Sequence, residues 1–90
     1  MIKHLNIHVY GCVQGVFYRA SAKETADKLG VKGFARNEKD GSVYIEAEGD
    51  EDILKEFIHW CYEGPERASV ERISTEDADM KNFTKFTIER

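Results

Sequence analysis

Residues 11–19 combine two glycines with an arginine, a composition suited to binding an anion. They read Gly-Cys-Val-Gln-Gly-Val-Phe-Tyr-Arg and lie where a strand is expected to end and a helix to begin. Glycines let such a loop turn tightly, so that its backbone N–H groups can converge on one point. The N-terminus of the following helix adds unpaired N–H groups and a partial positive charge. The segment therefore predicts an anion-binding loop.

Arg19 is the charged residue of this segment and falls in the first turn of the expected helix. A cation at that position costs up to about 1 kcal/mol unless an anion offsets it. A guanidinium can also bind two phosphate oxygens at once. Glycine-rich loops are common, however, and spacing alone leaves two interpretations open. Arg19 either binds a phosphate or is a surface arginine at a strand–helix corner.

Asn37 is the second residue that could take part in chemistry, and it lies at the expected end of another strand. Its amide offers both a donor and an acceptor, so it could hold a water molecule in one orientation. Asparagine is equally favoured where a turn begins, and residues 38–41 predict a hairpin turn directly after it. From the residues alone the two roles remain open.

The hydrophobic pattern predicts the elements that must position these residues. Asp50 is the expected N-cap of the second helix, Gly30 the left-handed cap of the first, and Gly64-Pro65 the end of the second. Gly11 is expected to end the first strand. In chain order the pattern indicates a strand at 5–9, a helix from 17 or 18 to 29, strands at 31–37 and 43–47, a helix from about 50 to 63, and strands at 70–74 and 83–89.

This order predicts an α+β fold of the ferredoxin-like type. Such a fold is a split βαβ sandwich, in which an antiparallel sheet carries two helices packed on one face. Right-handed crossovers would bring the ends of the first strand, the second strand and the second helix to one edge of the sheet. Arg19 and Asn37 are expected to meet at that edge. The length of 90 residues fits a single domain spanning 1–90.

Composition narrows the classes of function. The net charge is −4 and the lysines and arginines are scattered, which argues against binding to a nucleic-acid backbone. No apolar run approaches the roughly 20 residues that cross a bilayer, and the N-terminus lacks the apolar stretch of a signal peptide. We therefore expect a cytoplasmic monomer, complete at 90 residues, with no nucleic-acid or membrane partner.

The two cysteines and three histidines of the chain show no spacing typical of a metal site or a redox site. Cys12 and Cys61 match no zinc spacing, and His4, His8 and His59 have no partners at ligand spacing. The sequence therefore predicts no metal and no cofactor. The topology places both cysteines near one edge of the sheet, so a disulfide is conceivable, but a reducing cytoplasm favours two free thiols.

Two segments closely resemble the signatures of the acylphosphatase family. Residues 9–19 resemble the first signature, and residues 33–43 followed by Gly49 resemble the second. Gly64-Pro65 also fits the family, and the resemblance spans nearly the whole chain. Tyr18 departs from the family pattern, since the family usually has phenylalanine there.

The resemblance implies hydrolysis of a small-molecule acyl phosphate to a carboxylate and inorganic phosphate, without metal or cofactor. Arg19 would hold the phosphate, and Asn37 would orient the attacking water. The remaining phosphate-binding residues implied by the resemblance act through their backbone N–H groups and are Gln14, Gly15, Val16, Phe17 and Tyr18.

The main alternative is a non-catalytic ferredoxin-like module that binds an anion or RNA, or regulates another protein. An RNA-binding module would carry aromatic and basic residues on the sheet face away from the helices. Strand alternation predicts that this face is open to solvent and carries Tyr44 as its only aromatic residue, together with His4, His8, Ser42, Glu46 and Glu48. The pattern therefore argues against RNA binding. A second alternative, a domain that handles carbamoyl phosphate in hydrogenase maturation factors, belongs to longer chains.

Overall fold

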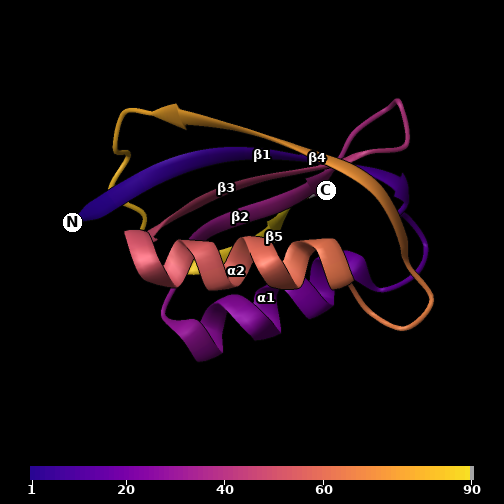
Figure 1. The fold of residues 1–90 in the computed structure, drawn as a ribbon, viewed down its shortest axis with the longest axis horizontal. Coiled ribbons are helices and arrows are strands. Elements are labelled where there is room, and N and C mark those ends of the chain that lie inside the picture. The colour runs from indigo at the N-terminus through magenta and orange to yellow at the C-terminus, as the bar shows by residue number, and fades with distance from the viewer. Residues whose placement is uncertain (90) are drawn as a thin grey trace.

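The computed structural model describes residues 1–89 and arranges them as five strands and two helices (Figure 1). In chain order the elements are β1 (Ile2–Cys12), α1 (Tyr18–Leu29), β2 (Lys32–Asn37), β3 (Val43–Asp50), α2 (Glu51–Glu63), β4 (Ser69–Ala78) and β5 (Phe86–Glu89). The strands form one sheet in the order β4-β1-β3-β2-β5. This is the ferredoxin-like α+β fold expected from the sequence.

Both helices lie on one face of the sheet, as Figure 1 shows. Strand residues with period two, such as Ile7 and Val9 in β1 and Ile45 in β3, are fully buried and face this helical layer. Phe57 of α2 is also fully buried, and burying a side chain of this size stabilises the fold by about 1.5–3 kcal/mol. The core therefore fixes the positions of both helices relative to the strand ends.

The helix ends follow the local signals in the sequence. Asp50 caps α2, because its side chain accepts a hydrogen bond from the N–H of Asp52 at 3.1 Å. Gly30 ends α1 with φ of 80°, in the left-handed region that favours glycine. Both predicted caps are confirmed.

Gly11 bends β1, and the prediction that it ends the strand was wrong. The pairing of β1 with β4 shifts register between Tyr10 and Gly11, which marks a bulge. Gly11 has φ of 132°, and a Cβ there would lie 2.2 Å from the carbonyl oxygen of Ser69. Only glycine allows this approach, so the strand continues to Cys12 and delivers the following loop to the sheet edge.

β5 pairs with β2 in parallel, whereas the other strand pairs are antiparallel. In this register Ala35 lies opposite Ile88 and Arg36 opposite Glu89. The last described residues of the chain thus lie beside the end of β2. The sheet is thus mixed, whereas the sequence predicted an antiparallel one, and a strand was expected here without its neighbour being identified.

The sheet face away from the helices is partly covered, contrary to the prediction that its charged residues face solvent. His4 is 1% exposed, Glu46 5% and Glu48 3%. Residues 79–85, between β4 and β5, cross this face and donate the N–H groups of Lys81 and Phe83 to Glu48 at 2.6 and 2.9 Å. Strand alternation cannot reveal such a crossing segment.

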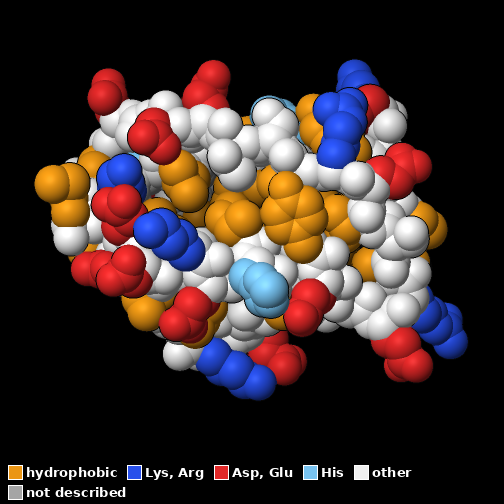
Figure 2. Space-filling model, in the orientation of Figure 1, with side chains coloured by type: hydrophobic (Ala, Val, Ile, Leu, Met, Phe, Trp, Pro, Cys, Tyr) orange, Lys and Arg blue, Asp and Glu red, His pale blue; other side chains and the backbone are white. Residues whose placement is uncertain are grey.

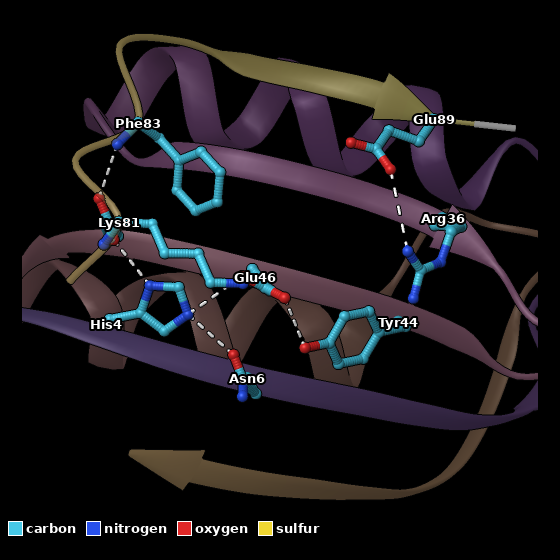
Figure 3. Close-up of polar contacts among 9 residues, drawn as sticks. His4, Asn6, Arg36, Tyr44, Glu46, Lys81, Phe83 and Glu89 are labelled. Atoms are coloured by element: carbon cyan, nitrogen blue, oxygen red, sulfur yellow. Dashed lines mark hydrogen bonds and ion pairs between the residues drawn. The ribbon is translucent and has the colours of Figure 1, made fainter. Parts of the chain in front are cut away.

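These polar side chains form one hydrogen-bonded cluster with Asn6 and Lys81 (Figure 3). The His4 ring lies 2.7 Å from Glu48 through Nδ1 and 2.8 Å from Asn6 Oδ1 through Nε2. Lys81 Nζ lies 2.8 Å from Glu46. The cluster therefore attaches the crossing segment to β1 and β3.

Tyr44 is not the only aromatic residue on this face, so that prediction was wrong as well. Tyr10 stacks near His8 with ring centroids 6.1 Å apart, and Phe34 lies 6.0 Å from Tyr44. Phe83 packs against Phe34 from the crossing segment. The composition of this face therefore does not exclude RNA binding, whereas the net charge of −4 still disfavours it.

An apolar groove lies between α2 and the edge strand β4, where Figure 2 shows apolar side chains at the surface. Leu5, Leu54 and Ile58 line it, together with Lys3 and Lys55. The groove shares no lining residue with the pocket described next.

Within residues 1–89, neither helix has the length and hydropathy needed to cross a membrane.

Candidate active site

The loop between β1 and α1 makes two left-handed turns close together. Gly15 has φ of 72° and Phe17 has φ of 63°. Phe17 is the N-cap of α1, yet its side chain makes no capping hydrogen bond and the first turn of the helix holds no acidic residue. The N-terminus of α1 therefore has neither a capping side chain at Phe17 nor an acidic residue in its first turn to offset its partial positive charge.

The N–H groups of residues 14–20 donate to no backbone carbonyl outside the regular elements within residues 1–89. The N–H of Ser21 donates to the carbonyl of Phe17 at 3.0 Å and so begins the hydrogen bonding of α1. Unpaired N–H groups at a helix N-terminus form a ready anion-binding site.

Gln14 attaches the loop to the hairpin that follows β2. Its side-chain amide donates to the carbonyls of Glu38 and Ser42, at 2.7 and 2.9 Å. Asn37 immediately precedes Glu38, so these two bonds fix the loop relative to Asn37. Gln14 was predicted only as a backbone donor, and its side-chain contact was not anticipated.

A pocket of about 260 Å³ lies where the loop, β2 and β5 meet. It is lined by Val13, Gly15, Phe17, Tyr18, Arg19, Ala20, Asn37 and Ile88. The structure thus brings Arg19 and Asn37 together with three of the predicted loop residues. Gln14 and Val16 do not line it, because Gln14 faces the hairpin and Val16 packs against the core.

Arg19 is half-buried and held from the end of β5. Its Nη1 donates to the backbone carbonyl of Glu89 at 2.7 Å. The side chain of Glu89 lies 3.9 Å from Arg36 of β2, as Figure 3 shows. The hydrogen bond from Arg19 to the carbonyl of Glu89 uses one of the five N–H donors of the Arg19 guanidinium. Arg19 is thereby oriented along the pocket wall while keeping donors for a ligand.

Asn37 carries a buried acceptor that nothing in the described chain satisfies. Its Oδ1 is enclosed and receives no hydrogen bond within residues 1–89. Such an atom costs about 1–3 kcal/mol in folding, and buried polar atoms are rarely left this way unless they have a function. Asn37 thus lines the pocket while its Oδ1 has no partner within residues 1–89.

The hydroxyl of Tyr18 has a structural role. It donates to the carbonyl of Cys61 at 2.7 Å and thus joins the start of α1 to the end of α2. Burial, together with the neighbouring Cys61, raises the pKa of Tyr18, so it remains a neutral donor. Cys61 is buried, Cys12 is exposed, and both are free thiols as predicted.

Residues 5–88 match the family model described as Acylphosphatase. The chain is 44% identical to an acylphosphatase of Thermotoga maritima over 87 residues, which is 97% of each protein.

Among solved structures, an acylphosphatase from Bacillus subtilis shares 33% identity with a TM-score of 0.95, and the match covers all of both chains. An acylphosphatase from Coxiella burnetii shares 30% identity with a TM-score of 0.94, over 98% of this chain and 93% of that one. By sequence and by structure, the chain belongs to the acylphosphatase family.

Proposed function

We propose that this acylphosphatase hydrolyses the carboxyl-phosphate bond by direct attack of a water molecule that Asn37 orients, while Arg19 and the loop N–H groups hold the phosphate. The observation that supports this assignment best is the shared pocket. The guanidinium of Arg19, the amide of Asn37 and the first residues of α1 border the same space.

Arg19 and the loop bind the phosphoryl group in this proposal. Phosphoryl transfer depends mainly on positioning and on stabilising charge. The N–H groups of Gln14, Gly15, Val16, Phe17 and Tyr18, with that of Arg19, surround the phosphoryl oxygens. The Arg19 guanidinium binds two of these oxygens as charge shifts in the transition state.

Asn37 aligns the water in line with the leaving carboxylate. The water oxygen bonds to phosphorus as the bond from phosphorus to the carboxyl oxygen breaks. A phosphate oxygen of the substrate accepts the water proton, and the carboxylate leaves without needing a proton. The proposed reaction uses neither metal nor cofactor.

We also propose that residues 1–90 form one domain, and that the protein is a cytoplasmic monomer that binds neither nucleic acid nor a membrane. The support for this proposal is the acidic net charge of −4 and the match of the family model across residues 5–88. Light scattering after size-exclusion chromatography tests the monomer. Gel-shift assays with single-stranded RNA test the alternative of a nucleic-acid-binding module.

A benzoyl-phosphate assay tests the activity. The purified protein is expected to release benzoate and phosphate at an undiminished rate in EDTA, and inorganic phosphate is expected to inhibit it competitively. A protein that binds inorganic phosphate but turns over no acyl phosphate would instead be the non-catalytic module.

A further inference from the structure

Two large apolar side chains at the surface border the pocket that contains Arg19 and Asn37. Phe17 is 73% exposed and Ile88 is 40% exposed, and both line this pocket. One comes from the start of α1 and the other from β5. Isolated exposed apolar residues are ordinary, but here two of them line the same pocket as Arg19 and Asn37.

Phe17 adopts a backbone conformation that disfavours its residue type. Its φ of 63° and ψ of 23° lie in the left-handed region, where a bulky residue is an outlier. Other left-handed positions of the chain hold glycine, as at Gly15 and Gly30, or asparagine, as at Asn82, a residue type that tolerates this region. A phenylalanine at residue 17 is therefore not explained by the turn itself.

The phenyl ring of Phe17 contributes few contacts that would stabilise the fold. It is largely exposed, and its side chain provides no helix cap. Within residues 1–89, no other aromatic ring stacks on it and no guanidinium covers it. A strained and exposed aromatic residue at the rim of a site is better explained by a ligand than by stability.

The lining of the pocket divides into two parts. Arg19 and Asn37 supply its polar side chains, while Phe17, Ile88 and Val13 supply bulky apolar ones. An acyl phosphate has the same division, with a charged phosphoryl group joined through a carboxyl oxygen to a carbon group. With the phosphoryl group at Arg19, the carbon group has an apolar surface in the same pocket.

We propose that Phe17 and Ile88 form an acyl-binding subsite, so that the chain prefers acyl phosphates with a large apolar acyl group to small ones such as acetyl phosphate. This proposal rests on the proposed function. The phenyl face contacts the acyl carbons, and Ile88 closes the opposite side. The chemistry at phosphorus is unchanged, and the apolar carboxylate leaves across the same surface.

Phe17→Gly tests the subsite, with kcat/KM measured for benzoyl phosphate and for acetyl phosphate. An open apolar rim discriminates by roughly tenfold. The ratio of kcat/KM for benzoyl phosphate to kcat/KM for acetyl phosphate should fall by about that factor in the variant. This ratio is the readout, because a change in the phosphate contact of the residue 17 N–H would affect both substrates alike. The thermal midpoint should not fall, since glycine suits this φ.

Ile88→Thr is the second variant, because it keeps a β-branched shape in β5 while making the wall polar. It should shift the ratio of the two kcat/KM values in the same direction. Tyr62→Ala is the control, since Tyr62 is 55% exposed and does not line the pocket, and it should leave the ratio unchanged.

Equal losses on both substrates, or an unchanged ratio in both rim variants, would overturn the subsite while leaving the activity in place. A wild-type protein that hydrolyses neither substrate would overturn the proposed function itself. The two failures are therefore distinguishable in one set of assays.

Discussion

Asn37 and Arg19 line the same pocket but differ in their hydrogen bonding. Arg19 is already oriented by the carbonyl of Glu89, whereas Oδ1 of Asn37 has no donor within the described chain. A guanidinium with a fixed direction suits charge stabilisation. An amide with an unmet acceptor suits a small mobile ligand such as water.

Asn37→Ala should lower kcat for benzoyl phosphate by about 100-fold, because misplacing a reacting group by about 1 Å costs that much. The inhibition constant of inorganic phosphate should barely change, since Arg19 and the loop remain. Removing an unsatisfied buried acceptor should also leave the urea midpoint unchanged or raise it. An unchanged kcat, or a large loss of phosphate inhibition, would contradict the assignment of water orientation to Asn37.

Arg19 and Asn37 became candidates through local signals, glycines in one case and a hairpin turn in the other, and the resemblance to the acylphosphatase signatures then implied their roles. Sequence reasoning could not find Glu89. The contact between Arg19 and Glu89 joins residues 70 positions apart and uses a backbone carbonyl, which every residue has. The position of Ile88 in the pocket was not predicted for the same reason, since it depends on the pairing of β5 with β2.

At the scale of elements, the site depends on where the first turn of α1 is held. The hydroxyl of Tyr18 joins that turn to the C-terminal end of α2 through the carbonyl of Cys61. Tyr18 also packs against Trp60, with ring centroids 5.3 Å apart. The departure from the family's usual phenylalanine therefore adds a link between the two helices.

Tyr18→Phe should lower the free energy of unfolding by about 1–3 kcal/mol, because the carbonyl of Cys61 is left without this donor. Turnover of benzoyl phosphate should change little, since the ring still packs in place. Urea denaturation of this variant beside Tyr62→Phe, an exposed control, measures the difference. Equal midpoints for wild type and Tyr18→Phe would show that the hydroxyl adds nothing.

The helices were predicted closely because caps are local, as Asp50 and Gly30 demonstrate. The edge strands were predicted less well. β4 reaches Ala78, beyond the expected end at residue 74, because its polar residues pair with β1 without any alternation to reveal them. Ladder pairing across the sheet is a long-range property that a single segment does not encode.

At the scale of the whole molecule, the segment that crosses the second sheet face depends on Glu48. Burial alone would raise the pKa of Glu48, but hydrogen bonds from His4 and from the N–H groups of Lys81 and Phe83 outweigh it. The pKa therefore lies below its ordinary value of 4.5. The folded state therefore binds a proton at Glu48 less readily than the unfolded state does. The ionised Glu48 stabilises the fold at pH values above the ordinary pKa of 4.5, and this stabilisation is lost as the pH falls through the lowered pKa of the folded state.

Urea unfolding between about pH 3 and pH 7 tests this contribution. Glu48→Gln should be less stable than wild type at neutral pH and should lose less stability on acidification, because the titrating group is gone. Glu76→Gln, at an exposed position of β4, should follow the wild-type curve. Parallel curves for wild type and Glu48→Gln would contradict the role of the carboxylate.

The assignment of Arg19 as the phosphate-binding residue is tested most directly by Arg19→Ala beside Arg67→Ala, an exposed arginine outside the pocket. Benzoyl-phosphate turnover and inhibition by inorganic phosphate are measured in both variants. Arg19→Ala should lose about 10³-fold in kcat/KM and most of its phosphate inhibition, while Arg67→Ala stays near wild type. Turnover within a few-fold of wild type in a folded Arg19→Ala protein would contradict the account.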